Sequence, residues 1–452
     1  MSLEQLFNPK SIAVVGASAK KGKVGNIVLR QVKESRAEVY PINPKEPKIE
    51  GLKCYRSVTE IEKQIDLAVI SLPAPLVLGA IKECASVEVR NAIVIAGGFK
   101  ETGERGKRAE KQILKTKGKM RILGPNTLGI YFPGNKIDTL FLPPDRMQRP
   151  KEGKIAFISQ SGAIAATLMD RLALYGIGIS AFVGLGNKLD INENECIDYF
   201  ANDQKTKAIC VYLESFKDAK GFGERCKKIS PKKPIVVIKA GRTERGKRAA
   251  SLHTGSLAGS DQVVDGAFKQ CGVIRAKTPN ELIDLGRALA YTLPPKGRRV
   301  AIIGNAGGFC VTCCDLIESH GILRVANLSS RTKSELKKVV LPFASVENPI
   351  DLTASAVDRM YKDTLDILVE SKEVDCILCG TSPQPPGLTE KLPEVVGRYA
   401  DRLPIIAYLV GGREAIERIR SFEKLGVAAY PEPESAVKTL EAVWQWAENT
   451  RT

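Results

Sequence analysis

The chain lacks the features that mark secreted, membrane-spanning or disordered proteins. Its first residues, MSLEQLFNPK, contain no basic stretch followed by an apolar one, and no apolar run approaches the ~20 residues that a membrane span needs. The cysteines number eleven, an odd count in a chain of 452 residues without signs of export, so we expect reduced thiols. With 43% hydrophobic residues, the composition also excludes disordered, collagen-like and disulfide-framework classes. We therefore expect a cytoplasmic protein without membrane partners, long enough for about three domains.

Acidic residues are scarce relative to basic ones. There are 68 lysines and arginines against 51 aspartates and glutamates, a formal net charge of +17, and such a field favours anionic partners. A nucleic-acid-binding protein should also show a recognisable module or aromatic residues interleaved with the basic ones. Only 6% of the residues are aromatic, and the basic residues are spread over short stretches such as KKGK and KTKGKMR. We therefore expect no nucleic-acid partner and favour small ligands that carry several phosphates.

One pattern recurs three times along the chain: a basic start, a short β-branched strand, a small or glycine-rich turn, and a helix. It appears as KSIAVVGAS at 10–18, as GKIAFISQSGA at 153–163 and as RRVAIIGNAGG at 298–308. Each is typical of a parallel α/β unit, in which a buried strand leads into a small-residue turn at a helix N-terminus. Further buried strands are expected at IDLAVISLP, NAIVIAG, AICVYLES, PIVVIKAG, CILCGTS and PIIAYLV.

The three openings predict three consecutive Rossmann-like or flavodoxin-like, doubly wound α/β domains with mainly parallel sheets. The stretches at 133–153 and 292–297 are expected to be linkers, because proline, glycine and lysine recur in them. The predicted domains are residues 1–132, 150–292 and 297–452.

The first opening resembles a nucleotide-binding turn but lacks the G-x-G-x-x-G pattern of NAD-binding domains. The turn reads GAS at 16–18 and is followed by the basic stretch KKGK at 20–23. The second strand ends in YPINPK at 40–45, without the acidic residue that would bind a ribose diol. Such a turn suits a ligand with an extra phosphate, such as coenzyme A, because helix N-termini with adjacent lysines bind anions. The alternative is a domain without a ligand, whose lysines are merely exposed.

Histidine is nearly absent, and one of the two histidines lies in an unusual segment. His320, in ESHG, lies at a predicted helix end and is expected to be structural. His253 lies in KRAASLHTGSLAGSD, a loop-like stretch of small residues after a basic run, where a histidine is either simply exposed or functional. Glu214 ends the strand AICVYLES and is expected to face the carboxyl edge of its sheet. His253 and Glu214 are therefore the candidate catalytic residues.

This pair has the chemistry of a phosphoryl-transfer site. A carboxylate hydrogen-bonded to one imidazole nitrogen leaves the other nitrogen basic and oriented for nucleophilic attack. Attack on phosphorus would give a phosphohistidine, and the phosphoryl charge then needs preorganised donors, which helix N-termini supply. Two turns are candidates: Ser161-Gly162 after the strand IAFIS, and Gly307-Gly308 after the strand VAII. Each turn alone is common in α/β folds, but with Glu214 and His253 they form a constellation.

Cysteines offer a competing site. Cys310, Cys313 and Cys314 lie in FCVTCCDLI, within a predicted helix, and Cys376 and Cys379 lie in the predicted strand CILCG. A metal ion or cluster needs more ligands at suitable spacing, and strand alternation does not place both strand cysteines on one face. We expect buried packing thiols and no metal site.

Taken together, the motifs resemble the succinyl-CoA synthetase superfamily. GKIAFISQSGA, GLGNKLDIN, the strand-ending Glu214 and KAGRTERGKRAASLHTGSLAGSD follow one another as in its CoA-ligase domain. The first domain, with SLPAP and LGPNTLG, resembles its CoA-binding domain. The third, with IIGNAGGFCVTCCD and ENPIDLT, resembles the ligase domain that ends the other subunit of succinyl-CoA synthetase. A single chain with all three domains resembles the α subunits of ADP-forming acetyl-CoA synthetases (acetate–CoA ligases).

This resemblance implies an activity and its residues. Acyl-CoA, ADP and phosphate would become carboxylate, CoA and ATP through an acyl phosphate and a phosphohistidine at His253. Glu214 would orient the imidazole, and Ser161-Gly162 and Gly307-Gly308 would begin the two helices that bind phosphate. The residues implied around CoA are Gly16, Ser18, Lys20, Gly25, Asn43, Ser71, Pro73 and Asn126.

The resemblance also implies a partner. The family places its ATP-grasp nucleotide site on a separate β subunit or a C-terminal extension, and the three domains leave no residues for it. We therefore expect an ATP-grasp β subunit that binds ADP or ATP with Mg²⁺, in an α2β2 heterotetramer. The alternative is a non-catalytic protein that binds CoA or acyl-CoA for regulation. The acyl group, whether acetate, propionate, or a branched or aryl acid, stays open.

Overall fold

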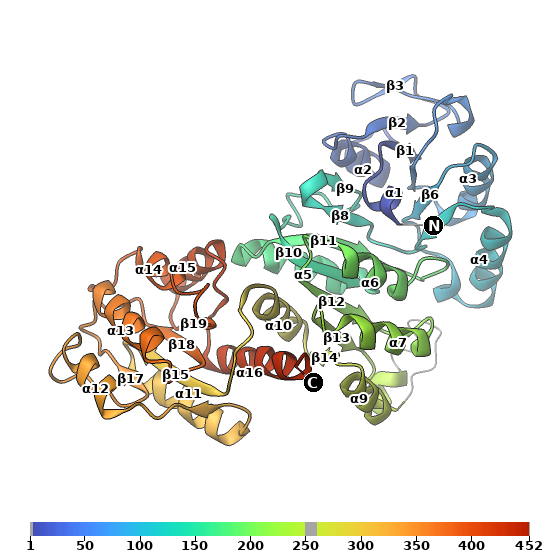
Figure 1. Ribbon diagram of the computed structural model, residues 1–452. Coiled ribbons are helices and arrows are strands. Elements are labelled where there is room, and N and C mark those ends of the chain that lie inside the picture. Colours follow the sequence, from blue (N-terminus) through green and yellow to red (C-terminus); the bar gives the residue numbers. More distant parts are fainter. Residues whose placement is uncertain (1–2, 249–259, 452) are drawn as a thin grey trace. The chain divides into compact units, whose positions relative to one another are not determined.

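The structure is a computed structural model that describes residues 3–248 and 260–451. The chain forms two compact units, Met1–Ala173 with Gly178–Pro279, and Leu174–Ile177 with Asn280–Thr452 (Figure 1). Besides a short two-stranded ribbon, the strands of the described residues form sheets of five, seven and six strands, mainly parallel, with helices between most successive strands. The predicted α/β class is confirmed.

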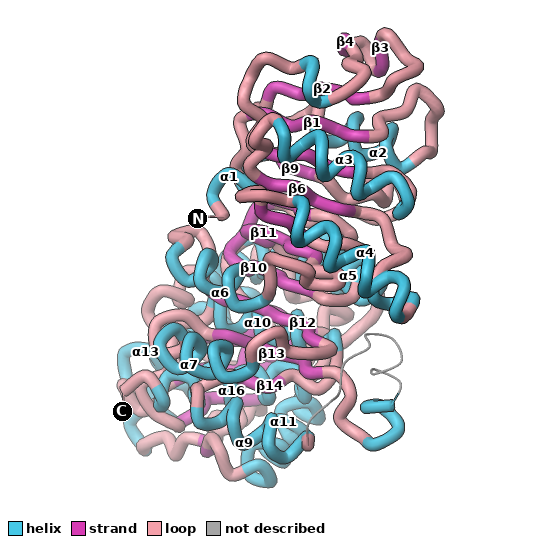
Figure 2. The backbone as a smooth tube through the Cα atoms, turned by 90° about the vertical axis from the view of Figure 1, so that its right-hand side faces the viewer, coloured by secondary structure: helices cyan, strands magenta, loops and turns pink. Residues whose placement is uncertain are grey.

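The first sheet, in the first unit, is built on the first of the three openings. Its region contains α1 (Glu4–Phe7), β1 (Ser11–Val15), α2 (Val24–Val32), β2 (Glu38–Ile42), β3 (Lys48–Ile49), β4 (Leu52–Lys53), β5 (Leu67–Ile70), α3 (Ala74–Ser86), β6 (Asn91–Val94), α4 (Glu104–Thr116) and β7 (Arg121–Leu123). The sheet is parallel, in the order β2-β1-β5-β6-β7. Ile12 and Val14 share a core with α2, whereas Ala13 and Val15 pack with α3 and α4, which lie on the same face in Figure 2. Helices on both faces explain why β1 is apolar and buried throughout.

The second sheet of this unit begins earlier in the chain than the sequence predicts. Its region contains β8 (Ile130–Phe132), β9 (Ile137–Asp138), β10 (Glu152–Ser159), α5 (Gly162–Tyr175), β11 (Ile179–Gly184), α6 (Glu193–Asn202), β12 (Ala208–Leu213), α7 (Ala219–Ile229), β13 (Ile235–Lys239), α9 (Asp261–Gln270) and β14 (Ile274–Arg275). The order is β14-β13-β12-β10-β11-β8-β9, and β8 and β9 are antiparallel additions. The linker prediction for 133–153 is therefore wrong at β9, which pairs with β8 and extends this sheet.

One apolar core spans both sheets of the first unit. Ile12 from the first sheet and Ile158 from the second belong to the same cluster of buried residues. Between them, the rings of Phe7 and Phe132 stack at 4.9 Å, and those of Phe7 and Phe200 at 5.9 Å. The two sheets are therefore parts of one packed body.

The second unit holds the third sheet. Its region contains α10 (Pro279–Tyr291), β15 (Arg299–Gly304), α11 (Gly307–His320), β16 (Arg324–Val325), α12 (Ser330–Lys337), β17 (Ile350–Asp351), α13 (Asp358–Ser371), β18 (Cys376–Thr381), α14 (Leu392–Gly397), β19 (Ile405–Leu409), α15 (Arg413–Lys424), β20 (Ala429–Tyr430) and α16 (Pro433–Asn449). The order is β16-β15-β18-β19-β20, with β17 also paired to β15. Buried Arg287 of α10 lies 3.2 Å from Glu423 and 3.9 Å from the ring centre of Tyr430. Helix α10, which lies in the range predicted for the second domain, is thereby packed into the second unit.

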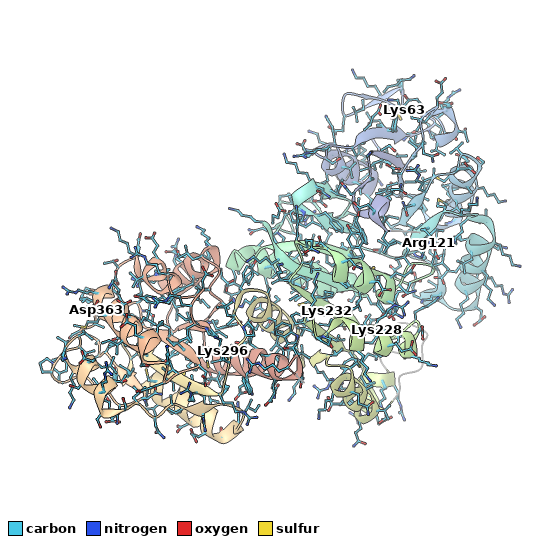
Figure 3. The ribbon with its side chains drawn as sticks, in the orientation of Figure 1. Lys63, Arg121, Lys228, Lys232, Lys296 and Asp363 are labelled. Atoms are coloured by element: carbon cyan, nitrogen blue, oxygen red, sulfur yellow. The ribbon has the colours of Figure 1, made fainter. Side chains whose placement is uncertain are left out.

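Basic side chains are distributed over the surface of each unit. Lys63, Lys228, Lys232 and Lys296, labelled in Figure 3, are exposed. This agrees with the interpretation of most basic stretches as solvated faces. Within the described parts of the chain, no helix has the length and apolar character needed to cross a membrane.

Candidate functional site

The carboxyl ends of the strands of the first sheet form one continuous edge. The parallel register aligns the last residues of β1, β2 and β5, so the residues that follow, Gly16, Asn43 and Ser71, are neighbours. The Asn43 side chain donates a hydrogen bond to the carbonyl of Ala17 at 2.8 Å, and the Ser71 hydroxyl donates to the carbonyl of Gly16 at 3.2 Å. The sheet thus brings three of the predicted CoA residues together.

Two glycines let helix α2 approach this edge closely. Gly16 has a φ of +88°, which L side chains rarely adopt, and a Cβ there would lie 2.8 Å from Leu72 Cδ2. Gly25, in the first turn of α2, is buried, and a Cβ there would lie 2.9 Å from Gly16 C and 3.0 Å from Ser71 Oγ. Gly25 therefore has a packing role that sets the N-terminus of α2 against the turn.

The edge continues over β5, β6 and β7. Pro73 stands at the N-cap of α3, three residues after the end of β5. Asn126, exposed after β7, has a φ of 58°, and its N–H donates to the carbonyl of Ala96 at 2.8 Å. Gly97 lies beside it, because a Cβ at Gly97 would be 3.1 Å from Asn126 Oδ1. The structure therefore places Pro73 and Asn126 along the same edge as the turn after β1.

The turn between β1 and α2 is basic and open to solvent. Lys20 and Lys23 are exposed, and the backbone N–H of Lys20 donates to Ser18 Oγ at 3.1 Å. The buried side chain of Asn26, 1% exposed, fixes the turn. Its amide donates hydrogen bonds to the carbonyl of Ser18 at 2.9 Å and to Glu50 Oε1 at 3.0 Å. Neither Asn26 nor Glu50 was predicted from the sequence. The available signal for Asn26 is an amide among the buried apolar positions of an amphipathic helix. Exposed cations at an open turn beside a helix N-terminus fit the phosphates of CoA.

Glu214 and Ser161-Gly162 both lie at the carboxyl edge of the second sheet. Strands β10 and β12 are neighbours, and the chain leaves them at Gln160 and Glu214. Gln160, 8% exposed, joins the two ends, because its Oε1 accepts the backbone N–H of Glu214 at 3.0 Å. Helix α5 begins at exposed Gly162, and the first turn of a helix leaves backbone N–H groups without intrahelical partners. The roles of Glu214 and of this turn stay predictions.

His253 lies outside the described residues. The chain before it leaves the edge at Lys239, the last residue of β13, which is the neighbour of β12. The chain after it returns at Asp261, the first residue of α9, and Asp261 lies 3.7 Å from Arg242. This ion pair links the chain before residues 249–259 to the chain after them.

The turn Gly307-Gly308 begins helix α11 in the second unit, as predicted. Asn305, 3% exposed, precedes it and clamps the end of the neighbouring strand β18. Its Nδ2 donates to the carbonyl of Ser382 at 2.9 Å, and its Oδ1 accepts the Ser382 N–H at 2.7 Å. The two hydrogen bonds hold the backbone before Gly307, and Gly308 is exposed at the helix start. Phosphate binding at this turn stays a prediction.

The cysteines form no competing site in the described residues. All eleven are free, and only Cys314 is not fully buried. Across residues 3–248 and 260–451, no group of three or more histidine, cysteine, aspartate or glutamate side chains could hold a metal ion. Burial raises the pKa of the Cys310 thiol to about 11, which keeps it protonated and unreactive. His320 ends α11 as predicted, and its Nδ1 lies 3.0 Å from the carboxylate of Glu441.

Three family models match the chain in sequence order. A CoA-binding domain matches residues 10–133, a succinyl-CoA ligase-like flavodoxin domain matches 152–289, and a ligase-CoA domain matches 300–452. Together they cover the three regions that the openings define.

Relatives match along the whole chain. A Pyrococcus furiosus protein named acetate–CoA ligase [ADP-forming] I subunit alpha is 43% identical, over 99% of this chain and 98% of that protein. A Methanocaldococcus jannaschii protein named acetate–CoA ligase [ADP-forming] is 36% identical over 98% of this chain, which spans 63% of that longer protein. A solved dinucleotide-forming acetyl-coenzyme A synthetase 1 of Ca. Korarchaeum cryptofilum, in complex with phosphate and ADP, superposes with a TM-score of 0.92 at 36% identity, covering 100% of this chain and 98% of that one. The chain belongs to the family of ADP-forming acetate–CoA ligase α subunits.

Proposed function

We propose that the chain is the α subunit of a cytoplasmic ADP-forming acyl-CoA synthetase, with acetyl-CoA as the first substrate to test. The observation that carries the proposal is 43% identity, along 99% of the chain, to a protein named as such a subunit. The geometry supports it, because one packed unit holds both a basic edge suited to CoA and the edge that carries Glu214. No observation favours the regulatory alternative.

The proposed reaction has three steps. Phosphate attacks the thioester carbon of acyl-CoA, so that a C–O bond replaces the C–S bond and CoA leaves as the thiolate. The imidazole of His253 attacks the phosphorus of the acyl phosphate, the P–O bond to the acyl group breaks, and the carboxylate leaves. ADP then takes the phosphoryl group from the phosphohistidine, which yields ATP and restores the imidazole.

Each group has a role that its position supports. The Glu214 carboxylate accepts a hydrogen bond from one imidazole nitrogen, which leaves the other nitrogen unprotonated for attack. The backbone N–H groups at the starts of α5 (Ser161-Gly162) and α11 (Gly307-Gly308) stabilise the phosphoryl oxygens. The residues proposed to line CoA are Gly16, Ser18, Lys20, Gly25, Asn43, Ser71, Pro73 and Asn126.

The proposal includes a partner. The Pyrococcus furiosus relative is named as an α subunit, and the Methanocaldococcus jannaschii relative extends well beyond the 63% that this chain spans. An ATP-grasp β subunit that holds ADP or ATP with Mg²⁺, in an α2β2 heterotetramer, would supply the nucleotide site.

The test is protein phosphorylation from acetyl-CoA and radiolabelled phosphate, with and without the candidate β subunit. Acid-labile, base-stable label on the wild-type chain is expected, and His253→Ala should abolish it. The matched control is His320→Ala, because His320 is the other of the two histidines in the chain and lies in the second unit beside Glu441. That variant should label like the wild type.

CoA affinity separates the two functional classes. If His253→Ala binds CoA within several-fold of the wild type but takes no label, the CoA edge and the histidine are separate sites, as proposed. If the wild type binds CoA but never labels, even with the β subunit, the catalytic proposal is wrong and the regulatory alternative replaces it.

A further inference from the structure

The loop that carries Glu214 is held by buried polar side chains from two other segments: the end of β10, and the connection from β11 to α6. The first is Gln160, at the end of β10. Its Oε1 accepts the backbone N–H groups of Glu214 at 3.0 Å and Ser215 at 3.1 Å, and its Nε2 lies 3.3 Å from Ser215 Oγ. The Gln160 side chain therefore fixes the backbone at Glu214 and Ser215, where the chain leaves β12.

The second contribution is a buried ion pair between β11 and α6. The side chains of Lys188 and Glu193 are 2% and 0% exposed, and their charged atoms lie 3.0 Å apart. Lys188 Nζ also donates a hydrogen bond to the carbonyl of Ser215, and Glu193 Oε1 accepts the backbone N–H of Lys217 at 2.7 Å. Both charged side chains thus hydrogen-bond to the backbone that follows Glu214.

Burying two charges is expensive, and an apolar pair of similar volume is often as stable. Burial lowers the pKa of Lys188, and the carboxylate of Glu193 opposes that effect. A gain in folding stability is therefore not the reason for this ion pair. Its hydrogen bonds to the backbone of the 214–217 loop give the better explanation. A carbonyl and an N–H of the 214–217 loop find charged partners that no apolar side chain could replace.

Lys188 is itself fixed from its other side. The preceding residue, Asn187, donates its side-chain amide to Glu101 Oε2 at 2.6 Å and to Glu110 Oε1 at 2.8 Å, both in the first sheet's region. Asn126, on the proposed CoA edge, donates to Asn187 Oδ1 at 3.4 Å. The segment that presents Lys188 is therefore anchored to the body of the unit.

We propose that Lys188, supported by Glu193 and Gln160, is a positioning residue that holds the Glu214 loop in register for orienting the phosphoryl-accepting histidine. The inference rests on the proposed function. It predicts that losing Lys188 slows phosphorylation of His253 without weakening CoA binding, because CoA is placed at a different sheet edge.

The experiment measures the rate of label incorporation from acetyl-CoA and phosphate by rapid quench, and the CoA dissociation constant by calorimetry, on the full chain with its β subunit. Lys188→Met should slow labelling about 10- to 100-fold, since a displacement of about 1 Å at a reacting group costs about that much. The CoA dissociation constant should stay within about threefold. Lys188→Arg, which keeps a donor, should recover part of the rate.

Two further variants keep the test decisive. Lys188→Met with Glu193→Gln removes both buried charges and retains an acceptor for Lys217, so it should fold and still label slowly. In a Glu214→Gln background, Lys188→Met should slow labelling no further, because a residue that acts through Glu214 has no effect once that carboxylate is gone. The matched control is Lys205→Met, from an ion pair with Glu152 that is 62% and 51% exposed.

The outcomes separate the two ideas. Wild-type labelling with an unchanged rate in Lys188→Met, or additive effects with Glu214→Gln, overturns the positioning role and leaves the proposed function intact. Absence of label on the wild-type complex overturns the proposed function and this inference with it.

Discussion

Replacing Gly25 with alanine tests how the proposed CoA edge is built. The added Cβ would lie 2.9 Å from Gly16 C and 3.0 Å from Ser71 Oγ, and it would overlap the carbonyl oxygen of Gly16. Two of these contacts are backbone atoms of a turn that β1 and β2 hold in place, so a side-chain rotation cannot relieve them. Helix α2 must move away from the turn, and its N-terminus moves with it.

The magnitude follows from two opposing effects. Overpacking a filled site costs about 1–3 kcal/mol, and alanine in place of glycine in a helix returns at most about 1 kcal/mol. With about 1 kcal/mol returned, we expect a net loss of up to about 2 kcal/mol for Gly25→Ala and weaker CoA binding. The control is Gly79→Ala in α3, where a Cβ meets nothing within 4 Å. That variant should gain about 0.4–1 kcal/mol and bind CoA normally.

The assay must report on the first unit. Both tryptophans, Trp444 and Trp446, lie in α16 of the second unit, so tryptophan fluorescence would follow the wrong transition. Hydrogen exchange of the β1 amides gives the opening free energy of the first unit, and calorimetry gives the CoA dissociation constant. A Gly25→Ala variant as stable as the wild type, with unchanged CoA affinity, would refute the close approach of α2 to the turn.

Two further predictions concern buried charges. Arg287→Met leaves the carboxylate of Glu423, 2% exposed, without its cation, so the second unit should lose about 3–5 kcal/mol in denaturant unfolding followed by tryptophan fluorescence. The same change at Arg413, whose side chain is 92% exposed, should cost no more than about 0.5 kcal/mol, and equal losses would contradict the argument. Burial raises the pKa of Glu101, but hydrogen bonds from the Asn187 side chain and from backbone N–H groups lower the pKa by more than burial raises it. The pKa of Glu101 in the folded protein is therefore below its ordinary value. Its contribution to stability is therefore complete above pH about 4.3 and is lost as the pH falls through the folded value. Acidification from pH 5 to 3 should thus destabilise the wild type more than Glu101→Gln, whereas parallel pH profiles would exclude this role.

The parts of the fold that the sequence predicted well are those encoded over short distances. Each opening joins a β-branched strand to a small-residue turn, and all three became a parallel strand followed by a helix. The short strands β8 and β9 escaped prediction because two or three residues carry no readable periodicity. The packing of α10 into the second unit was also not predictable, because the pattern of an amphipathic helix does not indicate which core its apolar face contacts.

Local sequence patterns pointed to the turns proposed to bind phosphate, to the candidate pair Glu214 and His253, and to a family resemblance that relatives along the whole chain confirmed. The contacts that hold the Glu214 loop in place were not predictable from these patterns and are seen in the folded sheet. The loop is contacted by Gln160, Lys188 and Glu193, at sequence separations of 54, 27 and 24 residues for the bonds to Glu214, Ser215 and Lys217. The physical reason is that a parallel sheet aligns the carboxyl ends of strands that are far apart in the chain. A buried polar side chain finds its partner across that edge, where no local pattern records it.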